Sequence, residues 1–178
     1  VLLAWDAEVE IVDSAGQREW HPLSTFYISY RKTLLQQGQY LAAIRIPRHQ
    51  FELPHRFYKL SKRFEDDISA VMCAVSLQMN RGEIKHARIA FGGVAATPVR
   101  ALLTEALLLQ KKPIDAVIAE ACAQLMSEIS PISDVRASGA YRKEMACNLL
   151  RRALLELRDD VELEVHHYPH SNEAALYV

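Results

Sequence analysis

Apolar and polar residues alternate in the first part of the chain, which is the pattern of half-buried β-strands. "AEVEIV" (7–12) alternates acidic and apolar positions, and "QREWHPL" (17–23) follows it after the turn residues "DSAG". We therefore predict a hairpin. Another strand is predicted in "QYLAAIRIP" (39–47), where Pro47 ends the pattern because proline has no N–H to donate. Between them, "STFYISYRKTLL" (24–35) indicates a mixed loop with a short helical turn.

A second alternating region begins in "ISAVMCAVSLQMN" (68–80). Val71, Cys73 and every second residue after them share one face, while small or polar side chains occupy the other. "NRGEI" supplies a turn, and "IKHARIAFGG" (84–93) returns with apolar residues on one face. This pattern predicts a long antiparallel hairpin that has a core face and a small-residue face.

Helical periodicity replaces alternation after this hairpin. Thr97 is predicted as an N-cap and Pro98 as the first helical residue of "VRALLTEALLLQ" (99–110). The segment 113–130 begins with another proline, and its apolar residues recur at i, i+3, i+4 and i+7, which predicts an amphipathic helix.

A third helix is predicted over 139–157, with Ser138 as its candidate N-cap. The order of elements predicts an α+β fold: the end of a β-rich subdomain, then an antiparallel sheet of about three strands covered by three helices. We divide the chain into a first subdomain (1–50), an α+β subdomain (51–160) and a tail (161–178).

Composition narrows the function classes. Half of the 178 residues are hydrophobic and the formal net charge is −1, so no basic field exists to attract nucleic acid or an acidic membrane. The apolar runs are too short to span a bilayer. The three cysteines form no C-x-x-C pair, which argues against a zinc site or an iron–sulfur cluster and favours free thiols in a reducing, cytoplasmic setting.

Three stretches suggest chemistry without establishing it. "FGGVAATP" (91–98) is either an anion site before a helix or a tight exit from a strand, and the strand exit is favoured. "VHHYPH" (165–170) clusters histidines, but its proline argues against a helix and no metal site is predicted. The run "YKLSKRFEDDISAV" (58–71) fits a solvated loop or a loop that holds a charged cofactor. No catalytic residue is predicted.

Three segments together resemble one family. They are "FYISYRKTLLQQGQYLAAIRIP" (26–47), "FYKLSKRFEDDISAV" (57–71) and "SPISDVRASGAYRKEMACNLLRRAL" (130–154). Their order and spacing resemble the FAD-binding subunit of molybdenum hydroxylases of the xanthine dehydrogenase type, which shares its fold with the CO dehydrogenase flavoprotein. The chain opens on Val1 inside a strand-like pattern, so we expect a C-terminal fragment of such a subunit.

The resemblance implies an oxidoreductase component that relays electrons from 2Fe-2S clusters through FAD to NAD. A molybdenum cofactor would lie on a large subunit and the clusters on an iron–sulfur domain, in a multi-subunit assembly. The glycine-rich loops that hold the FAD pyrophosphate in this family do not occur here, so we expect this fragment alone to be inactive. Two alternatives stay open: the medium subunit of a CO dehydrogenase-like enzyme, and a non-catalytic α+β interaction domain.

The resemblance also assigns cofactor-binding residues. Leu41 matches a strand residue that packs on the flavin, and Lys59 matches a lysine at the flavin ring system. A cation near the pyrimidine end of a flavin favours its negatively charged reduced form. Asp66 matches an acidic residue of a mobile loop beside the ring, and Arg31 matches a position in a supporting loop. Gly139 departs from the family pattern, which has a stronger helix former there.

Overall fold

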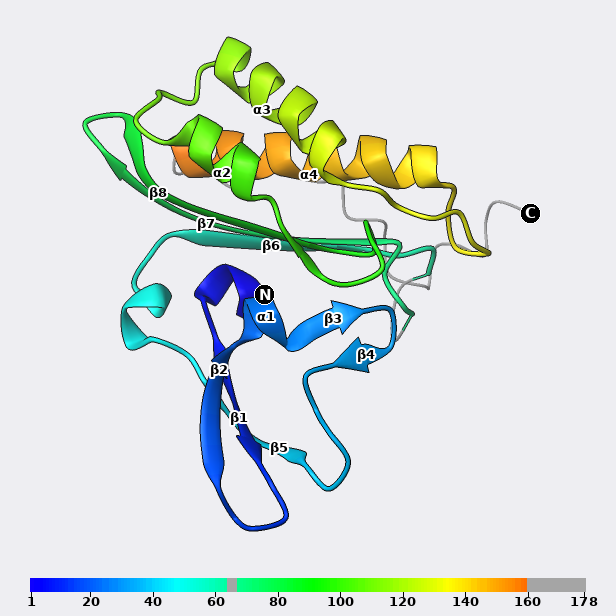
Figure 1. The fold of residues 1–178 in the computed structure, drawn as a ribbon. Helices are drawn as coiled ribbons and strands as arrows, with labels where there is room; N and C mark the ends of the chain where they lie inside the picture. Colours follow the sequence, from blue (N-terminus) through cyan, green and yellow to red (C-terminus); the bar gives the residue numbers. More distant parts are fainter. Residues whose placement is uncertain (64–66, 160–178) are drawn as a thin grey trace, which may run out of the picture.

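Two β-sheets with different surroundings form the frame of the molecule (Figure 1). The computed structural model describes residues 1–63 and 67–159; the predicted tail (161–178) lies outside them. One sheet belongs to an N-terminal unit that extends from η1 to η2, and the other belongs to a C-terminal unit that extends from β6 to α4. The mixed architecture with antiparallel sheets confirms the predicted α+β class.

The N-terminal unit contains a three-stranded antiparallel sheet of order β2-β1-β5 and a small β3–β4 hairpin. Its elements are η1 (Leu2–Trp5), β1 (Glu8–Val12), β2 (Arg18–Pro22), α1 (Leu23–Phe26), β3 (Tyr27–Ser29), β4 (Lys32–Thr33), β5 (Tyr40–Arg45) and η2 (Arg48–Phe51). The predicted first hairpin, the short helical turn and the strand before Pro47 are confirmed. Strands of two or three residues are too short to show a period in the sequence, so the β3–β4 hairpin was not predicted.

The C-terminal unit is built on a four-stranded antiparallel sheet of order β6-β7-β8-β9. Its elements are β6 (His55–Leu60), β7 (Val71–Asn80), β8 (Glu83–Gly92), β9 (Val99–Arg100), α2 (Leu102–Leu108), α3 (Asp115–Glu128) and α4 (Gly139–Asp159). The long β7–β8 hairpin and three helices agree with the prediction. The first strand, β6, was missed because it is an edge strand that carries cations in a run of mixed charge.

The predicted start of the first long helix at Thr97 and Pro98 is wrong. Val99 and Arg100 instead pair with β8 as strand β9, and the helix begins only at Leu102. The cap predicted for the last helix is confirmed, because the Ser138 hydroxyl accepts the N–H of Tyr141 at 3.1 Å.

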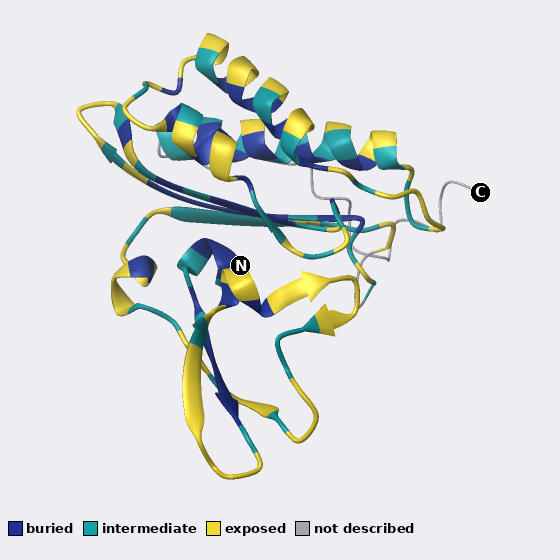
Figure 2. Cartoon of the chain, in the orientation of Figure 1, coloured by how far each residue is buried: buried dark blue, intermediate teal, exposed yellow. Residues whose placement is uncertain are grey.

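Helices α2, α3 and α4 cover one face of the four-stranded sheet (Figures 1 and 2). The apolar face predicted for β7 packs there, with Val71, Cys73 and Val75 fully buried against Leu150 and Leu154 of α4. None of the helices in residues 1–63 and 67–159 is long and apolar enough to cross a membrane.

The small-residue face of the same sheet packs on the N-terminal unit. Ala74 of β7 and Ala90 of β8 are buried in one cluster with Leu3, Leu23 and Phe26. We call the interface between this sheet face and the N-terminal unit the seam. Small side chains on the sheet allow the N-terminal unit to approach closely along this face.

Candidate functional site

A cavity of about 300 Å³ opens in the seam, between η1 and α1 on one side and β7 and β8 on the other. We call it the seam cavity. Its walls are mainly apolar and are formed by Val1, Leu2, Leu3, Leu23, Tyr27, Met72, Ala90, Phe91, Gly92 and Pro98. Ligand pockets in proteins have volumes of about 300–1,000 Å³ and mostly apolar walls with a few polar groups, so this cavity is a candidate binding site.

Lys59 lies beside the seam cavity in the strand register. It is directly opposite Met72 on β7, and Met72 is directly opposite Gly92 on β8. Directly opposed residues of antiparallel strands project from the same face, so Lys59 continues the row that lines the cavity. Its side chain is exposed, and within the described residues it makes no hydrogen bond or ion pair. The sheet thus brings one free cation to the border of an apolar cavity.

The other predicted cofactor-binding residues lie on different elements. Arg31 is exposed in the turn between β3 and β4, with a left-handed φ of 57°. In Figure 1 this turn and the end of β6 lie toward the same end of the four-stranded sheet. Leu41 is on β5, opposite Ile11 of β1, in the N-terminal sheet, so it does not join the row of Lys59. Asp66 lies outside the described residues.

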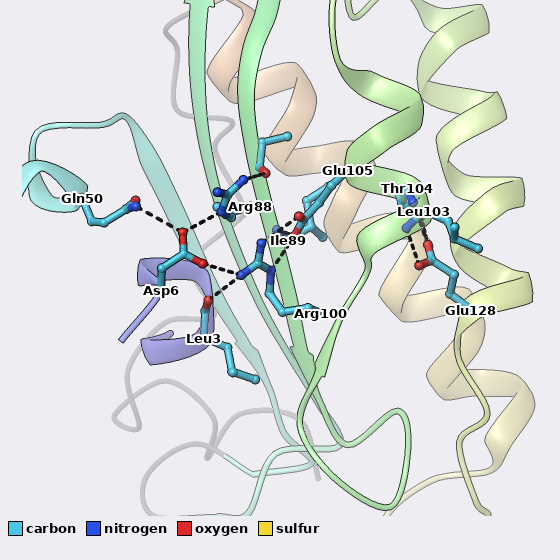
Figure 3. A network of polar contacts seen from close by, with 11 residues as sticks. Leu3, Asp6, Gln50, Arg88, Ile89, Arg100, Leu103, Thr104, Glu105 and Glu128 are labelled. Carbon is cyan, nitrogen blue, oxygen red and sulfur yellow. Dashed lines mark hydrogen bonds and ion pairs between the residues drawn. The ribbon is translucent and has the colours of Figure 1, made fainter. Parts of the chain in front are cut away.

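A network of ion pairs fastens the two units beside the cavity (Figure 3). Asp6 follows η1 and accepts hydrogen bonds from Arg88 of β8 at 2.7 Å and from Arg100 of β9 at 2.6 Å. Arg100 continues to Glu105 of α2 through a bidentate pair at 2.6 and 2.8 Å. We call these four residues the Asp6 network. It links the N-terminal unit to two strands and one helix of the C-terminal unit.

Charge partners decide how Asp6 titrates. Partial burial raises the pKa of this carboxyl, but the hydrogen bonds and charges of Arg88 and Arg100 outweigh burial and hold the pKa below its ordinary value. For Arg100, burial works against the charged form, while Glu105 and Asp6 raise its pKa. Asp6 and Arg100 therefore both favour their charged forms at neutral pH. No local sequence pattern predicts this network, because Asp6 and Arg100 lie 94 residues apart.

A second cavity, of about 490 Å³, lies where the loop before α4 meets the end of β6. Its lining includes Lys62, Asp134 and Arg136. Asp134 pairs with Arg136 at 3.8 Å and makes a shorter contact of 2.6 Å with the buried Arg142. Arg142 also donates to the carbonyl of Ala70 at 2.5 Å. Much of the "SDVRAS" motif therefore fixes the start of α4 onto the sheet.

Steric contacts explain why two positions in the chain are glycine. Gly93 has a φ of +80°, and a Cβ there would lie 2.4 Å from the carbonyl oxygen of Ala70, so "FGGVAATP" is a tight strand exit, as favoured. The helix begins well after it, which removes the alternative of an anion site at a helix start. At Gly139, a Cβ would lie 2.7 Å from the carbonyl oxygen of Pro131, which explains why a stronger helix former is absent.

Sequence reasoning missed the residues that line the seam cavity. Met72 and Gly92, for example, are of types that carry no catalytic signal. The one sequence signal for this cavity was the small-residue face of 68–80, because small side chains indicate a surface on which another part of the protein packs closely. Among residues 1–63 and 67–159 there is also no cluster of three or more His, Cys, Asp or Glu side chains that could hold a metal ion.

Family models match both units of the chain. A model described as the CO dehydrogenase flavoprotein C-terminal domain matches residues 56–157, more than half of the chain. A model described as the FAD binding domain in molybdopterin dehydrogenase matches residues 1–49.

The names of individual relatives refer to different substrates. The chain is 28% identical over 156 residues to the xanthine dehydrogenase FAD-binding subunit of Escherichia coli O157:H7, covering 86% of this chain and 53% of that protein. It is 27% identical over 157 residues to the glyceraldehyde dehydrogenase medium chain of Sulfolobus acidocaldarius, covering 88% and 55%. The structure of reconstituted CO dehydrogenase from Oligotropha carboxidovorans superposes with a TM-score of 0.81 at 27% identity, covering 89% and 55%. The chain thus spans about half the length of the relatives it matches.

Proposed function

Because this chain belongs to the CO dehydrogenase flavoprotein C-terminal domain family, we propose that it is the C-terminal part of the FAD-binding subunit of a xanthine dehydrogenase-type molybdenum hydroxylase. In this proposal the complete enzyme passes electrons from 2Fe-2S clusters through FAD to NAD. The observation that carries the proposal is the seam cavity, which lies between the segments that the two family models match.

The residues of the seam fit one edge of a flavin. The apolar walls suit a planar aromatic ring system, and Lys59 supplies a single cation at the border. Bound FAD would supply the hydride and single-electron transfer. The chain's own part is to exclude water with Leu3 and Met72 and to place a positive charge where a reduced ring accumulates negative charge.

The other assigned residues complete this proposal. Arg31, exposed in the β3–β4 turn, would support the open side of the cavity. Asp66, by the family resemblance, would place a negative charge beside the ring. Leu41 lies on β5 and would pack on the flavin from the N-terminal sheet.

The partners and acceptor follow the same proposal. A large subunit would bind the molybdenum cofactor, an iron–sulfur domain would deliver electrons, and NAD would accept them, with no contact to nucleic acid. The free cysteines of the described chain suit a cytoplasmic location. We also propose that the two units are separate subdomains, divided near residue 50.

Two alternative functions differ in what they predict for the seam. The medium subunit of a CO dehydrogenase-like enzyme would use the same cavity for FAD and differ in the substrate of its molybdenum partner. A non-catalytic interaction domain would need no ligand in the cavity, and filling it would leave cofactor content unchanged.

The test is to fill the seam cavity in the complete protein that carries this chain. We expect Met72→Trp to reduce the FAD content of the purified protein at least tenfold, because an indole would occupy the space between β7 and α1. Met126→Trp is the matched control, since Met126 is 46% exposed on α3. Full FAD content in a folded Met72→Trp protein would refute the placement of the flavin in the seam.

A further inference from the structure

Two cysteines face each other in the helical layer, on the opposite side of the sheet from the seam cavity. Cys122 lies on α3 and Cys147 on α4. The Cys122 thiol donates to the carbonyl oxygen of Cys147 at 3.5 Å, and the Cys147 thiol donates to the carbonyl oxygen of Cys122 at 3.4 Å. These reciprocal contacts place both sulfur atoms between the two helices. Both thiols are free.

Helices α3 and α4 pack directly against each other at this point. Ala121 and Ala146 precede the two cysteines and are fully buried, so small side chains allow the backbones of α3 and α4 to approach. A disulfide needs Cα atoms that are about 4.4–6.8 Å apart with side chains directed toward one another. Cys122 is 7% exposed and Cys147 is partly exposed, which gives a small oxidant access from the Cys147 side.

We propose that Cys122 and Cys147 are a thiol-oxidation site that hydrogen peroxide or another hydroperoxide converts into a reversible disulfide between α3 and α4. The third cysteine provides the contrast. Cys73 is fully buried under the helices in the centre of the sheet, has no thiol neighbour and stays reduced.

Local electrostatics suit this chemistry, because the thiolate is the reacting form. Contact with the Cys147 thiol, helped by the charge of Arg151, outweighs burial and lowers the pKa of Cys122. The same contact, together with burial, raises the pKa of Cys147. Cys122 is therefore the thiol of the pair that forms a thiolate more readily.

The reaction balances in two steps. The Cys122 thiolate attacks one oxygen of the peroxide, the O–O bond breaks, and the departing hydroxide takes up a proton as water, which leaves a sulfenic acid on Cys122. The Cys147 sulfur then attacks the Cys122 sulfur, the S–O bond breaks and a second water leaves. In total two thiols and one hydrogen peroxide give one disulfide and two waters.

The test is peptide mapping of the complete protein that carries this chain. After treatment with hydrogen peroxide, the remaining thiols are blocked and the protein is digested with trypsin without reduction. Cleavage sites lie between the two cysteines, so the disulfide would join the peptides 112–136 and 144–151. We expect this linked peptide in most molecules, its loss on treatment with dithiothreitol, and an unmodified Cys73.

Single serine variants identify the attacking thiol. Cys147→Ser should leave a Cys122 sulfenic acid that dimedone traps, whereas Cys122→Ser should give at least tenfold less trapped product at Cys147. Circular dichroism verifies that both variants are folded. Absence of the linked peptide in the parent protein, or oxidation of each thiol to sulfinic acid without linkage, would overturn the proposal. Equal trapping in both variants would overturn the role of Cys122.

Discussion

The two faces of the four-stranded sheet carry different kinds of side chain, although the same strands supply both. The face toward the helices is continuous and apolar, with Val75, Leu77 and Ile89 almost completely buried. The face toward the seam carries alanines, a cavity and the Asp6 network. Burial of apolar side chains is non-directional, whereas ion pairs impose a definite geometry.

This contrast teaches how one sheet can serve stability and binding separately. The helical face contributes most of the buried apolar surface, so it sets the free energy of unfolding. The seam face retains space and polar groups, which is costly for stability, and the proposed flavin site requires both. Substitutions on the two faces should therefore affect different measurements.

The largest effect on stability is expected on the helical face. Leu150→Ala removes a fully buried side chain of α4 and should lower the free energy of unfolding by about 3 kcal/mol. Urea unfolding of the complete protein measures this, with Leu102→Ala as the matched control because Leu102 is 60% exposed. FAD content of the folded protein should not change. If the folded variant lost FAD, the separation of the two faces would be wrong.

An intermediate effect is expected at the border of the seam cavity. Lys59→Met removes a cation without removing much apolar volume, so the protein should keep its stability. The flavin midpoint potential should fall by about 30–60 mV, since loss of a nearby positive charge disfavours the reduced cofactor.

Lys85→Met is the control for this measurement. Lys85 is also exposed on the same sheet, but it lies toward the other end of β8 from Gly92 and pairs with Glu83. If the flavin midpoint potential were equal in the parent protein and in Lys59→Met, Lys59 would not belong to the flavin site. The Met72→Trp test of the seam cavity would be unaffected by that result.

The sequence predicted the helical face better than the seam face for a physical reason. The periodic pattern of 113–130 and the alternation of 68–80 record which side chains are buried, and burial of many similar residues leaves a repeated signal. One departure came from a local rule: Pro98 fits a helix start, but tertiary pairing of Arg100 with Ala90 extends the sheet instead.

The seam face depends on pairings that no local pattern records. Asp6 meets Arg88 and Arg100 across 82 and 94 residues. Nothing in the residues around Asp6 selects these partners, and the position of the seam cavity follows from the same docking. The assignment of Lys59 came from family resemblance, and the strand register supplies a geometric reason that the sequence could not.

The smallest effect is expected from the acid titration of the Asp6 network, and it tests whether the seam is held by charge. The Asp6 pKa lies below its ordinary value of about 4 in the folded protein. Its contribution to stability is therefore fully present above that ordinary value and is lost as the pH falls through the lower, folded value. Asp6→Asn should cost about 1 kcal/mol at pH 7, a modest figure because the carboxylate is 35% exposed to solvent.

Urea unfolding from pH 7 to pH 3 measures this contribution. The difference between the parent protein and Asp6→Asn should be constant at neutral pH and shrink below about pH 4, because the protonated parent then resembles the variant. Asp115→Asn is the control, since Asp115 is 89% exposed and pairs only at 3.3 Å with Arg158 among its described contacts. A difference that persists unchanged at pH 3 would show that Asp6 acts through hydrogen-bond geometry alone. In that case hydrogen bonds and packing, and not charge, would hold the two units together.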